Sequence, residues 1–199
     1  MRIIEEELSR RGIVPPPGHA DIVKRAIHAT ADFDYAETLQ FTPDAPSELR
    51  GGVIVTDTNM ALAGINKAAL RRLGAAAYCF MSDEAIAAAA RQYGTTRAAA
   101  SMAYALERYP GAVFAVGNAP TALLRLAEGV EAGARPALII GVPVGFVNVV
   151  ESKERVWAAC TRHGVPAIVS AGRKGGSGVA AAICNALLYA ADPTRGAGS

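Results

Sequence analysis

The chain has 199 residues, of which 51% are hydrophobic and 19% charged, and its formal net charge is +2 at pH 7. This size and composition can bury one substantial core, which excludes a disordered or collagen-like protein. The net charge is too small for a nucleic-acid coat, so we expect no nucleic-acid partner and only local anion sites.

The cysteines and the chain start indicate the compartment. Cys79, Cys160 and Cys184 form no CxxC pair, so neither a disulfide framework nor a structural zinc site is predicted. The acidic start MRIIEEELSRR lacks the apolar region of a secretory signal. The longest apolar stretch, residues 137–150, is interrupted by two glycines and a proline and is too short for a membrane helix. We expect a cytoplasmic protein without membrane contact.

Short apolar runs alternate with alanine- and leucine-rich segments of helical spacing, which is typical of βα units around a parallel sheet. A short helix and the stiff PPP segment form an N-terminal helical extension over residues 1–20. Then, in chain order, we predict a helix over 22–31, a strand over 53–56, a helix over 66–73, a strand over 76–80, helices over 84–92 and 97–108, a strand over 112–116, a helix over 121–132, a strand over 137–141, a helix over 153–163, a strand over 167–170 and a helix over 179–191. The sequence thus predicts a single α/β domain over residues 1–199, with a mainly parallel five-stranded sheet between two layers of helices.

Four loops follow these strands, at the sheet edge where α/β proteins bind their ligands. They cover residues 56–67 (TDTNMALAGINK), 117–123 (GNAPTAL), 141–154 (GVPVGFVNVVESKE) and 170–178 (SAGRKGGSG). Their glycines permit close approach of a ligand, and Pro120 fits a first helical turn whose N–H groups would face the crevice. Tight turns into helices explain GNAPTAL and GRKGGSG equally well. If the helix N-termini converge, they favour carboxylates or phosphates.

Nucleotide-binding fingerprints are missing from these loops. GRKGGSG lacks the ordered GK[ST] of a P-loop, and no GxGxxG opens a helix after the first strand. We therefore predict no cofactor, and a nucleotide-binding module is disfavoured. The spacing of the cysteines gives no metal site either, so no bound metal is predicted.

His28 is the candidate for chemistry. On a helical projection it falls on the polar face, opposite the face that carries Ile22, Val23 and Ile27. It is either an ordinary surface histidine or a functional one that loops or a second subunit must cover.

Charged residues near helix starts supply candidates for binding anions. Arg97 lies in a first helical turn, where a cation opposes the helix dipole, so it is either an exposed arginine or the ligand of an anionic group. Lys67 and Lys174 add positive charge on loops, although solvated lysines would look the same. Asp57 follows a strand directly and is either an acceptor for a ligand or a helix cap.

Five segments together resemble the precorrin-8X methylmutase family. They are IHATADFDY (27–35), TDTNMALAGINK (56–67), GNAPTAL (117–123), GVPVGFVNVVESKE (141–154) and GRKGGSGVAAAICNALL (172–188). The TADFD and GINK stretches are similar to its cobalt-precorrin-8 branch. The resemblance implies a flavodoxin-like fold, a homodimer with shared active sites, and an isomerase of cobalamin biosynthesis without an external cofactor. The implied reaction moves a methyl group from ring carbon 11 to ring carbon 12 of the tetrapyrrole and gives cobyrinic acid from cobalt-precorrin-8.

The same resemblance places His28 at the family's catalytic histidine and Arg97 at a substrate-binding arginine. An imidazole suits the reaction because it can give a proton to a ring nitrogen near the migrating methyl group and then take it back. The carboxylate arms of such a substrate account for local cations and helix N-termini. The predicted substrate-binding residues are Thr56, Asp57, Lys67, Arg97, Asn118, Thr121 and Lys174.

Two further expectations accompany this assignment. Relatives have a Ser-Phe pair just before the segment that here begins at Met1, and its serine is a suspected substrate contact; either the chain manages without it or the start lies further upstream. The alternative function is a noncatalytic tetrapyrrole-binding or carrier protein, because groups that hold the substrate also hold the product.

Overall fold

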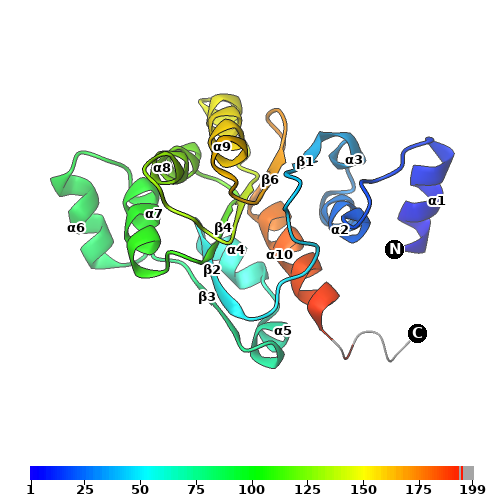
Figure 1. Cartoon of the computed structure of the whole chain (residues 1–199), viewed down its shortest axis with the longest axis horizontal. Helices are drawn as coiled ribbons and strands as arrows, with labels where there is room; N and C mark the ends of the chain where they lie inside the picture. The colour runs from blue at the N-terminus through cyan, green and yellow to red at the C-terminus, as the bar shows by residue number, and fades with distance from the viewer. Residues whose placement is uncertain (193, 195–199) are drawn as a thin grey trace.

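A six-stranded sheet forms the centre of the protein, whose computed structural model describes residues 1–192 and 194 (Figure 1). The strand order is β1-β6-β5-β4-β2-β3. All neighbours are parallel except β1, which pairs antiparallel with β6. The parallel strands have the order of flavodoxin-like folds, which places a switch point between β2 and β4. The strands are β1 (Leu39–Phe41), β2 (Gly52–Thr56), β3 (Ala75–Tyr78), β4 (Val113–Val116), β5 (Leu138–Gly141) and β6 (Ala167–Ser170).

Two layers of helices cover the sheet. On one face α2, α4, α5 and α10 pack against Ile54, Val113 and Ile140. On the other face α7, α8 and α9 pack against Val55, Phe114 and Ile139. In the described part of the chain the helices are α1 (Arg2–Arg10), α2 (Ala20–Thr30), α3 (Tyr35–Thr38), α4 (Asn59–Gly64), α5 (Lys67–Arg72), α6 (Glu84–Gln92), α7 (Arg97–Arg108), α8 (Pro120–Glu131), α9 (Val149–His163) and α10 (Ser177–Ala191).

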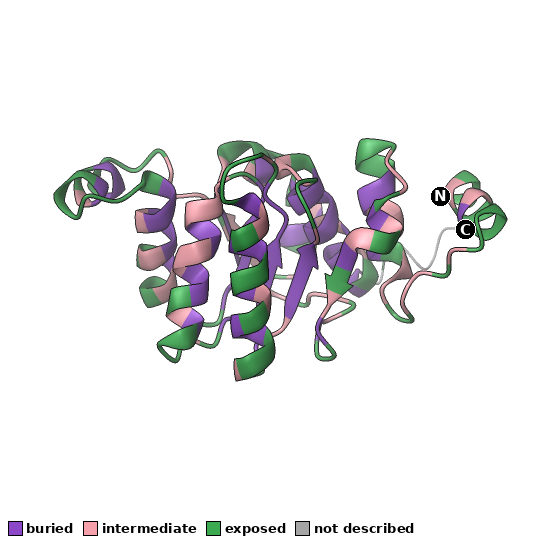
Figure 2. Cartoon of the chain, turned by 90° about the horizontal axis from the view of Figure 1, so that it is seen from above, coloured by how far each residue is buried: buried purple, intermediate pink, exposed green. Residues whose placement is uncertain are grey.

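Two helices project from opposite ends of the molecule. α1 lies beyond α2 at one end, and α6 lies beyond α7 at the other (Figure 1). The central strands are buried, whereas both projecting helices carry much exposed surface (Figure 2). The helical extension predicted over residues 1–20 corresponds to α1, which is anchored by the buried Leu8. None of the helices in the described residues is long and apolar enough to span a bilayer.

The predicted α/β class is confirmed, but the predicted number of strands was one too low. β1 has three residues and exists because Leu39 pairs with Ser170 and Phe41 with Ile168, partners far away in the sequence. The predicted loop 56–67 contains α4, and α9 begins at Val149 rather than at Lys153. α4 is short and ends at Gly64, where an added Cβ would lie 2.8 Å from Ala181 Cβ. These elements depend on tertiary contacts more than on local periodicity.

Candidate active site

Asp57 follows β2 and is fully buried beneath the loop that leaves β4. Its carboxylate accepts hydrogen bonds from the backbone N–H groups of Gly117, Asn118 and Ala119 at 2.9, 2.8 and 2.7 Å. Burial raises the pKa of Asp57, and the three N–H donors oppose this effect. These three N–H groups, which precede the first turn of α8, are thus bound by the protein's own carboxylate and do not face a ligand.

Thr56 is the last residue of β2 and lies beside Asp57, at the carboxyl ends of the parallel strands. Its side chain is buried and donates to the carbonyl oxygens of Thr58 at 3.0 Å and Tyr78 at 3.3 Å. The Thr58 hydroxyl caps α4 and lies 2.8 Å from the Ser177 hydroxyl at the start of α10. Thr56 and Thr58 therefore join the loops after β2, β3 and β6.

The N-termini of α7 and α8 meet at this edge. The Thr96 hydroxyl accepts the N–H of Ala99, which caps α7, and lies 2.8 Å from the Thr121 hydroxyl in the first turn of α8. Arg97 is the first residue of α7, and both Arg97 and Asn118 are exposed. Arg97, Asn118 and Thr121 thus lie near two helix N-termini, which attract negative charge.

Lys67 lies in the layer of α2, α4 and α10, on the other face of the sheet from Arg97. It opens α5, which Asn66 caps, and its exposed side chain lines a hollow of about 500 Å³ together with Leu62, Leu70 and Arg71. Neither Lys67 nor Arg71 forms an ion pair with another described residue. This hollow therefore carries two uncompensated positive charges beside apolar side chains.

His28 lies in the last turn of α2 with its side chain exposed. It lines a shallow hollow of about 240 Å³ whose other walls include Arg25, Gly64, Ala181 and Asn185. Among the described residues it has no hydrogen-bond or ion-pair partner. Both ring nitrogens are thus available to a ligand, and the predicted polar-face position of this histidine is confirmed.

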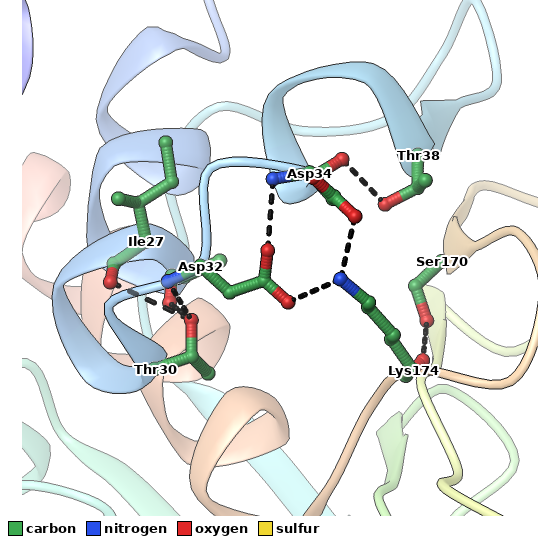
Figure 3. Close-up of polar contacts among 8 residues, drawn as sticks. Ile27, Thr30, Asp32, Asp34, Thr38, Ser170 and Lys174 are labelled. Atoms are coloured by element: carbon green, nitrogen blue, oxygen red, sulfur yellow. Dashed lines mark hydrogen bonds and ion pairs between the residues drawn. The ribbon is translucent and has the colours of Figure 1, made fainter. Parts of the chain in front are cut away.

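Lys174 lies in the loop after β6, and its ammonium group is held between two carboxylates (Figure 3). It donates to Asp32 Oδ2 at 2.7 Å and also to Asp34 Oδ2. These hydrogen bonds raise the pKa of Lys174, and the bond from Lys174 lowers the pKa of Asp32. The structure thus places this candidate against the end of α2 and not beside Arg97.

The candidate residues fall into two groups on opposite faces of the sheet. His28 and Lys174 lie with α2 and α10, whereas Arg97 and Thr121 lie with α7 and α8. Asp57 directly follows β2, in the sheet between the two groups, and is buried beneath the loop after β4. One chain therefore presents its histidine and its arginine on different sides.

Three charged residues of this region were missed from the sequence, namely Lys153, Asp32 and Asp34. Lys153 follows the buried Val149 by four residues and precedes the buried Val156 by three, so helical spacing puts it on the apolar face of α9. A lysine on the apolar face of a helix could therefore have been predicted to be buried. The aspartates gave no such signal, because their partner Lys174 is 140 or more residues away.

The described residues contain no group of three or more His, Cys, Asp or Glu side chains that could hold a metal ion.

Comparisons with known proteins identify the family. The family model described as precorrin-8X methylmutase matches residues 1–190. The cobalt-precorrin-8 methylmutase of Salmonella typhimurium is 46% identical over 179 residues, which cover 87% of this chain and 82% of that protein. The precorrin-8X methylmutase of Pseudomonas aeruginosa is 39% identical over 192 residues, which cover 92% and 89%.

A solved structure agrees with these matches. The precorrin-8X methylmutase of Thermus thermophilus is 38% identical to this chain, with a TM-score of 0.76 over 93% of this chain and 95% of that one. Sequence and structure thus confirm the resemblance carried by the five motifs. The chain belongs to the precorrin-8X methylmutase family, whose members are isomerases of cobalamin biosynthesis.

Proposed function

We propose that the protein is a cobalt-precorrin-8 methylmutase, which moves a methyl group from ring carbon 11 to ring carbon 12 of its substrate. The product is cobyrinic acid, or hydrogenobyrinic acid from a substrate without cobalt. The reaction is an isomerisation: one carbon–carbon bond breaks, another forms, and no oxidant or external cofactor takes part. The relative from Salmonella typhimurium, which carries the name of this activity, supports the choice of substrate.

The observation that carries the proposal is the free His28 side chain in its hollow. In the proposed mechanism its imidazolium protonates a ring nitrogen beside the migrating methyl group. This withdraws electron density from the macrocycle and eases the migration. The neutral imidazole then takes the proton back and restores the conjugated product. A positioned proton donor of this kind accelerates a reaction by about 10² to 10⁴-fold.

The carboxylate arms of the substrate fit the exposed polar groups of this edge. In the proposed site Arg97, Asn118 and Thr121 bind arms near the starts of α7 and α8, and Lys67 binds another. Thr56 and Asp57 support these contacts from below by holding the loops. Lys174 borders the site from the side of α2, with its ammonium group on Asp32 and Asp34. Several local cations therefore serve an acidic substrate despite the net charge of only +2.

The proposed active form is a homodimer with shared active sites. His28 and Arg97 lie on opposite faces of the sheet of one chain, and the hollow of His28 is open. If the α7 end of one subunit lies near α2 of its partner, both residues can reach one flat ligand and the hollow is covered. The dimer thus brings a His28 side chain and an Arg97 side chain to the same ligand, which a single chain does not do.

The cytoplasm is the proposed compartment. Cys79, Cys160 and Cys184 are all free thiols, as is usual where reducing agents keep disulfides from forming. The tetrapyrrole and a second copy of the chain are the partners in this proposal, and nucleic acid has no part in it.

His28→Ala is the test of this function. The substrate's visible absorption would be recorded over time after mixing with the wild-type enzyme or with the variant. We expect a slow, catalytic spectral shift with the wild type. The variant should lose at least about 10²-fold in kcat, because its proton donor is gone, and still bind the tetrapyrrole. His163→Ala is the matched control, because His163 also lies in the last turn of a helix, on α9.

Two outcomes would count against the proposal. Unchanged turnover in His28→Ala would reject the role of the imidazole. An immediate, stoichiometric spectral change with no further turnover by the wild type would instead indicate the carrier function.

A further inference from the structure

Lys153 is the buried member of the four lysines of the chain, with an exposed fraction of 2%. Its Nζ donates to the carbonyl oxygens of Gly172 and Lys174, both at 2.8 Å. Within the described residues no carboxylate pairs with it. Burial therefore lowers the pKa of Lys153 to about 8. A buried ammonium group without a counter-ion destabilises a fold unless hydrogen bonds compensate it, and here the two carbonyl oxygens supply such bonds.

The two carbonyl groups belong to the turn that follows β6. Ser170 Oγ also donates to the Lys174 carbonyl oxygen, at 2.9 Å. The Gly176 N–H donates to Val142 O at 2.8 Å, and a Cβ at Gly175 would collide with that same oxygen. The backbone of this turn thus faces inward, onto Lys153 and onto the loop after β5, and has little room to move.

The side chain of Lys174 extends from the same turn toward Asp32 and Asp34 (Figure 3). Asp32 is fixed at both carboxylate oxygens, because Oδ1 accepts the Asp34 N–H at 3.0 Å while Oδ2 accepts Lys174. The Asp32 N–H in turn donates to Thr30 Oγ1 at 3.2 Å. Lys174 therefore connects the turn after β6 to the last residue of α2.

His28 is two residues before Thr30 on this helix. α2 ends where Ala31 adopts a left-handed conformation, with φ 57°, which costs energy in a residue with a Cβ. The contacts of Asp32 and Asp34 with Lys174 hold the chain just beyond this residue. The contacts with Lys174 are thus a second attachment of the His28 end of α2, beside the packing of the buried face of α2 against α10.

We propose that Lys153 is a positioning residue, whose ammonium group clamps the turn after β6 so that Lys174 can hold the His28 end of α2. This inference rests on the proposed function, in which His28 must meet the macrocycle accurately. A small displacement of a catalytic group reduces turnover more than it reduces binding.

The test compares kcat and KM of Lys153→Met, Lys174→Met and the double variant. Methionine preserves the length and apolar stem of lysine but removes the ammonium group. We expect each single variant to lose about 10-fold in kcat with KM changed less than about 3-fold. The double variant should lose no more than the worse single variant, because both residues act through one contact. Lys24→Met is the control. Lys24 lies on α2, as His28 does, and like Lys174 it is bound to two carboxylates, here those of Glu5 and Asp21; the kcat of this variant should stay at the wild-type value.

Limited trypsin digestion tests the clamp without any activity assay. Arg173 and Lys174 are exposed cleavage sites in the clamped turn. Cleavage there should become about 10-fold faster in Lys153→Met and stay unchanged in Lys24→Met, because a loosened turn opens more often. A wild-type enzyme without methylmutase activity would overturn the proposed function, while this digestion would still test the clamp.

Three outcomes would overturn the inference. Wild-type kcat in a folded Lys153→Met would show that the ammonium group positions nothing. A loss of about 100-fold in the double variant would show that the two lysines act independently. If Lys153→Met does not fold, the kcat of Lys174→Met and of the double variant Asp32→Asn/Asp34→Asn is measured instead. A wild-type kcat in both of these variants would overturn the inference.

Discussion

A carboxylate and an ammonium group are buried at the carboxyl edge of the sheet, and in the described structure both are bound by backbone groups. Asp57 accepts three N–H groups, and Lys153 donates to two carbonyl oxygens. Hydrogen bonds to charged groups contribute about 1.5 to 3 kcal/mol each, and an unpaired partner costs as much or more. Each residue can therefore fix the glycine-containing loop to which it is bound.

Arg97 should act mainly in binding. We expect Arg97→Gln to raise KM about 10-fold, which corresponds to about 1.4 kcal/mol of lost interaction with a substrate carboxylate, and to change kcat little. Steady-state kinetics would measure both constants. Arg91→Gln is the control, because Arg91 is exposed on α6 and has no ion pair among the described residues. Equal KM values for Arg97→Gln and the wild type would remove this arginine from the site.

The positions of some candidate residues could be predicted from the sequence because their signal is local. The position of His28 on the polar face of α2 follows from helical spacing, and Arg97 follows from the capping threonine before it. The pairing of Lys174 with Asp32 could not be predicted, since it depends on how β6 is placed beside the end of α2. For Lys153 only part could be predicted. Helical spacing indicates that its side chain is buried, but the sequence does not indicate which carbonyl groups it binds.

At the scale of elements, the joint between α7 and α8 organises one half of the site. Thr96→Ala removes both the cap of α7 and the contact with Thr121. We expect it to lower the free energy of unfolding by about 1 kcal/mol, as measured by urea denaturation. Thr95→Ala is the matched control, because the Thr95 side chain makes no hydrogen bond among the described residues, and it should change stability by less than about 0.5 kcal/mol. Equal stability of the two variants would contradict the capping role.

Uniformly apolar strands and long amphipathic helices were predictable because their patterns are local and repeated. β4, β5 and β6 are buried along their whole length, as strands covered on both faces must be. β1 and α4 have too few residues to show a period. Both are stabilised by segments more than 100 residues away, β1 by β6 and α4 by α10.

The whole molecule is elongated, with α1 and α6 at opposite ends and the carboxyl edge between them (Figure 1). His28 belongs to the layer of α2 and α10, and Arg97 to the layer of α7 and α8. In the proposed dimer these two residues meet on one substrate because two chains combine. We propose that each active site takes His28 from one subunit and Arg97 from the other.

Mixed dimers test this claim most directly. His28→Ala and Arg97→Gln subunits would be produced together, and activity would be measured well below KM. Random association makes about half of the dimers mixed, and each mixed dimer regains one site with both native residues, so we predict about a quarter of the wild-type activity. Activity no higher than that of the two separate variants combined would show that His28 and Arg97 act within one chain, and would contradict the account.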